Sequence, residues 1–579
     1  MLSFIYSREK YTLVLLSVAI GILISAPAIY FRYFDGGYKG IDFFGSDAEN
    51  YYLGQIQEIY DGHWFSGNIY VEEGKNDPYV QQPLPAMIIA FLGQSLGISA
   101  RDVNVLTKFL FPALLTVIVY LFFSALTGRK DFAILMTIFV MLIQASWIFF
   151  DPGSWLPFLL KGEFRGTDYN FISYARPINP QISSIFFFGY LLCAWKFFFS
   201  RLSEKMEKIY GIASAVILGL SFYIYFFTFS FLSVFNAVLF FWFLYSRDWI
   251  RLKKTFLVSI GALAIAVPYF ANVLEMMKSP NYSQLAHRTN ILETHRFIFS
   301  KVWWGVTALF LLLYRGSRKV KIFTLAFLAT AFLVTNQQLI TGKTLPLPAH
   351  YHWYYIAPIG GAILVYLFFM YFEKLAGLFV SRLAMLFFIL ISFYAGFLYQ
   401  KISYTKQWDY FIYQQRYAPI LSWLDLDIKK ESAIFTNEDL SGLIPAYTRH
   451  NVYYSGLLTD SLISEERIRH SLYVYFFLNG VTEDSARDFF YDNRDWVGSQ
   501  IFSDYYRQKS GCHGCFPDSI LDGFIQEYRK FLKKGFLEQI KKYQVDYAVW
   551  DKEKNPEWRL DRFFNEKVYE KDNIIVYKF

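Results

Sequence analysis

The sequence predicts a polytopic α-helical membrane protein with a soluble C-terminal domain of mixed α/β structure. Apolar residues make up 55% of the 579 residues and charged residues only 18%, against roughly 25% charged in an ordinary soluble protein. The apolar residues gather in runs such as 11–30 and 379–399, each long enough to cross a hydrocarbon layer of about 30 Å as a helix. Such runs recur until about residue 400 and then stop, which predicts a membrane domain over 1–400 and a soluble domain over 401–579.

Short basic segments between the apolar runs indicate the orientation. They lie at 8–10, 128–130, 201–208, 247–254, 315–321 and 374–382. Lysine and arginine are enriched in cytoplasmic loops, so these segments predict about eleven transmembrane helices, with the N-terminus inside and the C-terminal domain outside. The predicted spans are 11–33, 105–127, 132–150, 183–200, 209–228, 229–245, 256–275, 301–314, 322–336, 353–372 and 380–399. With no organelle signal evident, a bacterial inner membrane is the simpler location.

The net charge of +8 is explained by these loops, so no nucleic-acid partner is expected. The loops on the predicted external face are unequal, and the longest are 34–104 and 151–182. Long loops between packed elements are more often functional than connecting. They share a face with the C-terminal domain, so the working surface is expected to be external.

The first external loop carries the clearest candidates for chemistry. Asp47 and Glu49 open a helix-like stretch that directly follows a membrane span. A carboxylate at the membrane–water boundary can deprotonate an acceptor hydroxyl or bind a metal ion. Capping of the helix by Ser46 or Asp47 is the alternative. Further along, Gln81-Gln82-Pro83-Leu84-Pro85 begins an apolar segment that is too short to span the membrane and is typical of an interfacial helix.

This order of elements resembles the GT-C glycosyltransferases, which include protein O-mannosyltransferases and lipid A aminoarabinose transferases. The resemblance rests on Asp47-Ala-Glu49-Asn-Tyr51 and on Gln82-Pro83-Leu84-Pro85. It implies transfer of a sugar from a polyprenyl-phosphate donor to a hydroxyl of a lipid, glycan or protein acceptor, with inversion, on the external face. Asp47 would be the general base, with Glu49 beside it. Several members carry a charged pair before the prolines, where this chain has Gln81 and Gln82.

A donor phosphate needs hydrogen-bond donors, and other external loops supply candidates. Arg176 lies at a predicted loop–span junction, where its guanidinium can fork two phosphate oxygens or extend toward the interface. Lys343, His350 and His352 lie in the last external loop. Asp151, Gln81 and Gln82 form a further polar group of candidates. No cofactor is certain, and the pattern leaves open a divalent metal ion.

After residue 405 short β-rich runs alternate with helical patterns. The expected strands are 433–436, 452–454, 547–550 and 574–577, with a helix over 520–543. This alternation predicts a small mixed domain. Cys512 and Cys515 favour a local disulfide over a zinc or redox site, since they complete neither.

Two other classes of function are also compatible with the sequence. A multi-pass transporter would need charged residues within spans or paired broken helices, and few such residues are present. A non-catalytic scaffold with an external binding domain is the second alternative. Besides donor and acceptor, the expected partners are membrane lipids.

Overall fold

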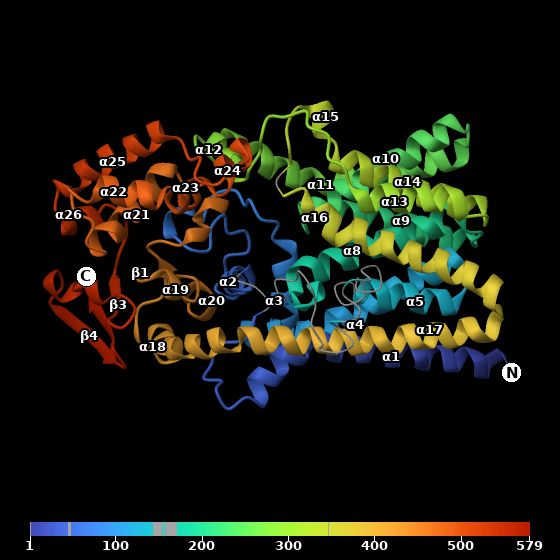
Figure 1. Ribbon diagram of the computed structural model, residues 1–579, viewed down its shortest axis with the longest axis horizontal. Coiled ribbons are helices and arrows are strands. Elements are labelled where there is room, and N and C mark those ends of the chain that lie inside the picture. The colour runs from blue at the N-terminus through green and yellow to red at the C-terminus, as the bar shows by residue number, and fades with distance from the viewer. Residues whose placement is uncertain (1, 45–47, 143–152, 154–156, 158–170, 346) are drawn as a thin grey trace.

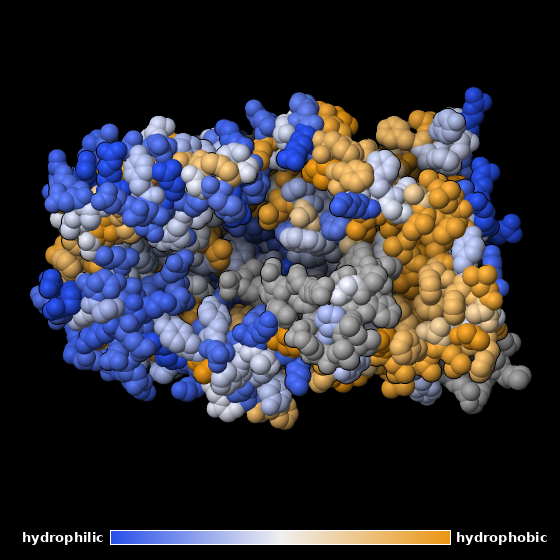
Figure 2. Space-filling model, viewed as in Figure 1, coloured by the Kyte–Doolittle hydropathy of each residue, from blue (hydrophilic) through white to orange (hydrophobic). Residues whose placement is uncertain are grey.

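A computed structural model describes residues 2–44, 48–142, 153, 157, 171–345 and 347–579. Figure 1 shows a helical bundle at one end of an elongated molecule and the C-terminal domain at the other. Apolar side chains gather over the bundle, and polar side chains cover the C-terminal domain (Figure 2). This division follows the hydropathy change that the sequence shows near residue 400.

The bundle is built from long apolar helices. In the described chain they are α1 (Leu2–Tyr33), α4 (Ala100–Thr127), α5 (Lys130–Met141), α8 (Ser183–Phe199), α9 (Glu204–Ser221), α10 (Phe226–Tyr245), α11 (Trp249–Lys278), α13 (Lys301–Leu313), α14 (Arg318–Thr335) and α17 (Ala357–Gln414). Gly377, at φ +81°, divides α17 into two arms, a conformation that glycine adopts without steric cost. Each predicted span overlaps one of these helices or arms, while residues 143–150 of the third lie outside the described residues.

Six segments of the described chain are both long and apolar enough to cross a membrane. They are Lys10–Tyr33, Ala100–Thr127, Pro177–Phe199, Phe226–Tyr245, Trp249–Lys278 and Ala349–Asp427. The last contains both arms of α17. The remaining bundle helices are shorter or carry more charge at one end, so the number of crossings stays a prediction.

Close packing between helices depends on small residues. A Cβ on Gly219 of α9 would stand 2.9 Å from the carbonyl oxygen of Ala262 in α11. A Cβ on Gly361 of α17 would stand 2.1 Å from the ring of Phe139 in α5. Small residues let helix backbones approach where lipid gives no hydrophobic drive for association, and these two glycines permit the α9–α11 and α5–α17 contacts.

The predicted boundary between the fifth and sixth spans, at 228/229, is wrong. Helix α9 ends at Ser221 and α10 begins at Phe226. Tyr225 between them is extended, at φ −167° and ψ 133°. The turn itself reads Phe222-Tyr223-Ile224-Tyr225, so no charged residue, glycine or proline marks the break.

Short elements lie between the bundle and the C-terminal domain. They are α2 (Ala48–Tyr60), η1 (Glu72–Gly74), α3 (Leu84–Leu96), η3 (Ser173–Ala175), η4 (Pro177–Ile182), α12 (Tyr282–Arg288), α15 (Gln338–Thr341), α16 (Ala349–Tyr351) and η5 (His352–Ile356). Helix α3 is the one expected to start at the two prolines. Pro85 occupies its first turn, where a missing N–H costs nothing.

The C-terminal domain packs helices around a five-stranded sheet of order β2-β1-β3-β5-β4. Its strands are β1 (Ala433–Phe435), β2 (Asn451–Val452), β3 (Tyr547–Asp551), β4 (Glu566–Lys571) and β5 (Ile574–Lys578). Its helices are η6 (Gln415–Tyr417), α18 (Ala418–Asp427), α19 (Glu438–Ser441), α20 (Ile444–Tyr447), η7 (Gly456–Asp460), α21 (Glu465–Leu478), α22 (Ala486–Asp492), α23 (Arg494–Phe502), α24 (Tyr505–Ser510), α25 (Asp518–Leu532), α26 (Phe536–Ile540), η8 (Pro556–Trp558) and η9 (Leu560–Arg562). The first three strands are parallel and β5 runs antiparallel to both β3 and β4.

Strand β4 was not predicted because its sequence is highly charged. It reads Glu-Lys-Val-Tyr-Glu-Lys, and such residues are depleted in strands. As the edge strand of the sheet it benefits from charges that discourage pairing with another chain. The predicted helix over 520–543 is two helices, α25 and α26. The predicted disulfide between Cys512 and Cys515 is present.

The bundle and the C-terminal domain are joined by a helix rather than by a flexible linker. Helix α17 continues through residue 400 to Gln414 and passes directly into η6. The hydroxyl of Tyr404 donates to the Asp35 carboxylate at 2.6 Å, and the indole N–H of Trp408 donates to the same oxygen at 2.7 Å. The long helix is therefore fixed to the start of the first loop.

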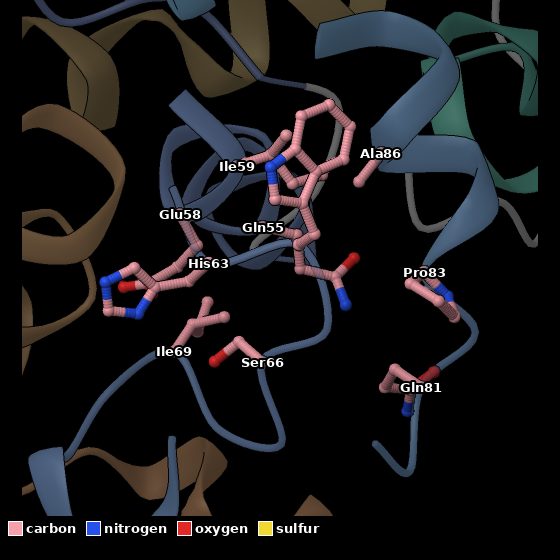
Figure 3. A pocket seen from close by; sticks show the side chains of 10 residues that line it. Gln55, Glu58, Ile59, His63, Ser66, Ile69, Gln81, Pro83 and Ala86 are labelled. Carbon is pink, nitrogen blue, oxygen red and sulfur yellow. The ribbon is translucent and has the colours of Figure 1, made fainter. Parts of the chain in front are cut away.

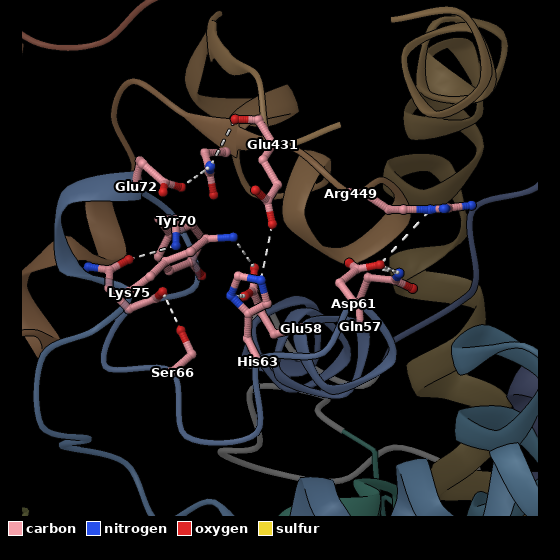
Figure 4. Close-up of polar contacts among 12 residues, drawn as sticks. Gln57, Glu58, Asp61, His63, Ser66, Tyr70, Glu72, Lys75, Glu431 and Arg449 are labelled. Atoms are coloured by element: carbon pink, nitrogen blue, oxygen red, sulfur yellow. Dashed lines mark hydrogen bonds and ion pairs between the residues drawn. The ribbon is translucent and has the colours of Figure 1, made fainter. Parts of the chain in front are cut away.

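The first loop also packs into the C-terminal domain. The carbonyl oxygen of Tyr70 accepts a hydrogen bond from the Val452 amide at 2.6 Å, and Tyr70 lies in that domain's hydrophobic core. Figure 4 shows the polar contacts around this junction: buried Glu58 pairs with Lys75 at 3.1 Å, and His63 contacts Glu431 at 3.1 Å. Because α2 ends in this junction, its position depends on both parts of the chain.

Asp42, in the first loop before α2, gives a pH-dependent test of this packing. Burial raises the pKa of its carboxyl from 3.8 to about 6, although Arg32 and Arg101 oppose the shift. Since the folded-state pKa exceeds the unfolded one, the ionised carboxylate is disfavoured in the fold. Below a pH of about 4 the carboxyl is protonated in both states and costs the fold nothing. As the pH rises to about 6, the cost to the free energy of unfolding grows to roughly 3 kcal/mol and then stays constant.

We therefore expect Asp42→Asn to be more thermostable than wild type at pH 7 and equal to it near pH 4. Thermal unfolding of both proteins across this pH range measures the difference. Asp409→Asn, a charge removal far along α17, is the control and should not change the pH profile. An Asp42→Asn protein with the wild-type pH profile would contradict the burial argument.

Candidate active site

Seven charged, imidazole or phenol side chains come together where the bundle meets the short elements. We call them the boundary cluster: Glu49, Tyr52, Lys108, Arg176, Tyr225, His350 and Tyr354. They come from α2, α4, the η3–η4 junction, the α9–α10 turn, α16 and η5. Segments that are far apart in the sequence thus supply one site.

A buried ion pair fixes the first turn of α2 to the bundle. Glu49 and Lys108 are paired, with side chains 2% and 3% exposed. The Lys108 ammonium also donates to the carbonyl oxygen of Ala175 at 3.1 Å. Buried charges are tolerated only when paired and hydrogen-bonded, so this pair sets the position of α2 relative to α4 and to the η3 turn.

Arg176 supplies the guanidinium of the cluster. It precedes Pro177 and is extended, at φ −94° and ψ 122°, as expected of a residue before proline. Its Nη2 donates to the Tyr354 hydroxyl at 2.6 Å. The Glu49 carboxylate and the phenols of Tyr52, Tyr225 and Tyr354 all act on its charge, so the guanidinium lies at the electrostatic centre of the cluster.

His350 is fixed by hydrogen bonds that attach its segment to α10. Its Nδ1 lies 2.6 Å from the Tyr225 hydroxyl. The hydroxyl of Tyr351 lies 2.6 Å from Ser230 Oγ, and that of Tyr355 lies 2.7 Å from Thr228 Oγ1. These bonds place the imidazole near Arg176, whose charge acts on it.

Tyr52 lies close enough to Glu49, Arg176 and Tyr354 for all three to act on its phenol. Burial is the main cause that raises the pKa of its phenol, and Tyr354 and Glu49 raise it further, while Arg176 and Asn179 oppose them. The phenol therefore stays protonated at neutral pH and can donate a hydrogen bond to an oxyanion. Arg176, Tyr52, Tyr225 and His350 together form a site with a guanidinium and several hydrogen-bond donors, which suits a phosphate.

The structure groups some of the predicted site residues and separates others. Glu49, Arg176 and His350 belong to the boundary cluster. His352, half-buried in η5, makes no hydrogen bond or ion pair with the cluster in the described residues. Lys343 lines a different recess, whose walls include neither Arg176 nor His350. Asp47 and Asp151 lie outside the described residues.

Gln81 and Gln82 lie beside the cluster's helices without joining it. Gln81 lines a small pocket with Glu58, His63 and Trp64 (Figure 3), and its volume of about 20 Å³ is enough for one water molecule. Gln82 is hydrogen-bonded to Tyr269 of α11. Neither amide contacts Arg176 in the described chain, so a polar role for this pair stays a prediction.

A metal ion would need a set of converging ligands. Among the described residues no three His, Cys, Asp or Glu side chains are arranged to hold one. The carboxylates of Asp47 and Asp151 are not among the residues described.

Lys108 and the tyrosines were not predicted as site residues. Lys108 lies within the predicted span 105–127, and a lone charge in an apolar span is a signal for a functional site. Tyr52, Tyr225 and Tyr354 carried no such signal, because aromatic residues are common at any membrane interface.

Comparisons with known proteins were made for the whole chain. A scan against protein-family models and a search of curated proteins both find no match. Among solved structures, the chain is similar to ArnT from Cupriavidus metallidurans, at 14% identity and a TM-score of 0.45 over 98% of both chains. It is also similar to the oligosaccharyltransferase from Archaeoglobus fulgidus, at 12% identity and a TM-score of 0.46 over 93% of this chain and 70% of that one.

Two further structures capture these proteins with ligands. ArnT bound to undecaprenyl phosphate matches at 13% identity and a TM-score of 0.45 over 97% of both chains. The archaeal oligosaccharyltransferase AglB in complex with an inhibitory peptide and a dolichol-phosphate matches at 11% identity and a TM-score of 0.46. Both proteins are GT-C glycosyltransferases, the class that the first loop resembles. At these values the likeness is one of overall architecture.

The buried ion pair gives a direct test of the cluster's construction. Lys108→Met leaves the Glu49 carboxylate buried and without its ammonium partner, which typically costs about 3–5 kcal/mol. We expect a clearly lower Tm for this variant and recovery in Glu49→Gln/Lys108→Met, measured by thermal unfolding of the purified chain.

Lys208→Met is the matched control. Lys208 pairs with Glu204 on the exposed surface of α9, where an ion pair contributes about 0–1 kcal/mol. Equal effects of Lys108→Met and Lys208→Met on Tm would show that the Glu49–Lys108 pair does not organise the site.

Proposed function

We propose that this chain is a glycosyltransferase that moves a sugar from a polyprenyl-phosphate donor to an acceptor hydroxyl, with inversion at the sugar carbon. The observation that carries the proposal is the boundary cluster: a buried guanidinium bonded to a phenol and surrounded by further phenols and an imidazole at the end of an apolar bundle. The first-loop motif that begins at Asp47 supports the same class of reaction.

The donor phosphate is assigned to Arg176. Guanidinium groups bind phosphate through parallel N–H bonds, and one arm of Arg176 is already fixed by the Tyr354 hydroxyl. The rings of His350 and Tyr225 lie 5.2 Å and 6.3 Å from the ring of the same Tyr354. The polyprenyl chain would extend from this point between the apolar helices.

The acceptor hydroxyl is assigned to Asp47, which immediately precedes α2. In the proposed step the Asp47 carboxylate takes the hydroxyl proton and the acceptor oxygen attacks the anomeric carbon. The bond between that carbon and the phosphate oxygen breaks, and its electron pair stays on the phosphate. The charge that develops there is stabilised by Arg176, and such preorganised stabilisation is usually the largest contribution to catalysis.

Glu49 takes a different role in this proposal from the one expected of a second catalytic carboxylate. It is buried and paired with Lys108, so the Lys108 ammonium balances its negative charge. Glu49 is therefore a positioning residue that fixes the first turn of α2 against α4. The active face is assigned to the external side of the membrane on the distribution of lysine and arginine in the loops.

The Asp47 assignment predicts that Asp47→Asn loses transfer with its fold intact. Asparagine caps a helix about as well as aspartate but cannot accept the proton, and loss of a general base typically costs on the order of 10²- to 10⁴-fold in rate. Transfer of a labelled sugar from a polyprenyl-phosphate donor, in reconstituted membranes at equal protein, measures the loss.

Asp77→Asn, a change of the same kind in the same loop, is the control and should keep near-normal transfer.

Arg176→Lys tests the donor site, because it keeps the charge but removes the guanidinium fork. We expect this variant to show a large loss of kcat/KM for the donor. Near-normal activity in Asp47→Asn would remove this residue from the mechanism. If the wild-type protein transfers sugar from none of the polyprenyl-phosphate donors tested, the proposed function is contradicted.

A further inference from the structure

A second and larger recess is lined by residues of α12, α15 and α24, which lie along the same edge of the molecule in Figure 1. Its volume is about 1200 Å³. One wall is the segment 291–299 with Lys343 and Thr344, another is α12, and the third is formed by Tyr505, Gln508 and Lys509 of α24. The recess therefore joins the bundle's loops to the C-terminal domain and is separate from the boundary cluster.

The wall of the recess is rigid because two loop segments are hydrogen-bonded to each other. The Thr294 amide donates to the Gly342 carbonyl at 2.8 Å, and the Thr344 amide donates to the Leu292 carbonyl at 2.8 Å. This pairing sets Glu293 opposite Lys343. The Ile298 amide is further bonded to Asn336 Oδ1 at 2.8 Å, so the side chains of this wall stand in defined places.

The charge of the recess is positive. Its described lining contains three cations, Arg296, Lys343 and Lys509, and one carboxylate, Glu293. All four side chains are exposed. Lys509 lies 5.6 Å from the Tyr505 ring, and this ring lies 5.1 Å from that of His287, which places the lysine against the recess rather than away from it.

A buried arginine beside the recess attaches α12 to the C-terminal domain. Arg288, next to His287, is fully buried, and its Nη2 donates to the Ser461 carbonyl at 2.8 Å. The carboxylates of Asp460 and Glu465 act on its charge, so Arg288 is not counted among the cations of the recess.

The other end of the recess is apolar and leads to a membrane helix. Phe297 and Phe299, which line it, are 43% and 61% exposed. Phe299 stacks on Trp304 of α13 at 6.0 Å, and α13 begins two residues later, at Lys301. Exposed aromatic residues directly before an apolar helix are typical of a membrane interface.

We propose that this recess binds a membrane lipid with an anionic head group. The head would lie between Arg296, Lys343 and Lys509, and the acyl chains would leave across Phe297 and Phe299 into the bilayer. Basic pockets beside membrane helices recognise such head groups, and each lysine or arginine near them contributes about 1 kcal/mol. The inference assigns Lys343 to this lipid and does not depend on the proposed sugar transfer.

Lipid binding by the purified full chain tests the proposal. Phosphatidylglycerol and phosphatidylcholine with identical acyl chains are titrated, and bound lipid is counted by native mass spectrometry. Wild type should prefer phosphatidylglycerol, and Arg296→Gln/Lys343→Gln/Lys509→Gln should bind it on the order of 100-fold more weakly, given three basic residues. The matched control, Lys430→Gln/Lys530→Gln/Lys533→Gln, removes three exposed cations of the C-terminal domain and should keep the preference.

Two further arms distinguish a lipid from a free anion and a binding defect from misfolding. Glycerol 3-phosphate, which carries the head charge without chains, should bind at least ten times more weakly than phosphatidylglycerol. The triple variant should keep the wild-type Tm in lipid-free detergent. Equal binding of the two lipids by wild type, retained preference in the triple variant, or equally tight binding of glycerol 3-phosphate would each overturn the proposal.

Discussion

The buried ion pair between Glu49 and Lys108 is the interaction on which the rest of the site depends. It fixes the first turn of α2, the helix that Asp47 precedes, against α4 of the bundle. The same ammonium is bonded to the carbonyl of Ala175, one residue before Arg176. One charge therefore joins the first turn of α2 to the segment that carries the proposed phosphate ligand. Removing either partner would leave an uncompensated charge in a low-dielectric environment.

Two further contacts keep this arrangement rigid. Tyr70 of the first loop lies in the hydrophobic core of the C-terminal domain, while Asp35 at the start of the loop is bonded to α17. Helix α17 runs on without a linker into that domain. The first loop is thus held at its start and near its middle by structures that lie more than 300 residues away in the sequence, which suits a site that must keep its donors in place during turnover.

Much of the architecture could be predicted because it follows from local patterns. Hydropathy and basic loops located the bundle helices, and alternation located four of the five strands. Strand β4 was not predicted because its charges suit a sheet edge rather than a core, and the turn at 222–225 was not predicted because no charged residue, glycine or proline lies in it. Arg176 and His350 were predicted from their positions at loop–span junctions. Their partners Tyr225 and Tyr354 could not be, since only tertiary packing brings these tyrosines together.

Lys343 shows that the sequence also suggested a grouping of residues that the structure does not contain. A basic residue in the same loop as His350 suggested a shared phosphate site, yet the backbone pairing with residues 292–294 directs that loop segment to a separate recess. Proximity in the sequence did not imply proximity in space, because Lys343 lines the recess while His350 belongs to the boundary cluster.

The most direct test of the proposed glycosyltransferase is an experimental structure of the protein with a polyprenyl phosphate. The proposal predicts phosphate oxygens at hydrogen-bonding distance from the Arg176 guanidinium, about 2.7–3.2 Å, with the chain between bundle helices. A phosphate bound away from Arg176, whether beside Lys343 or elsewhere on the bundle, would contradict it.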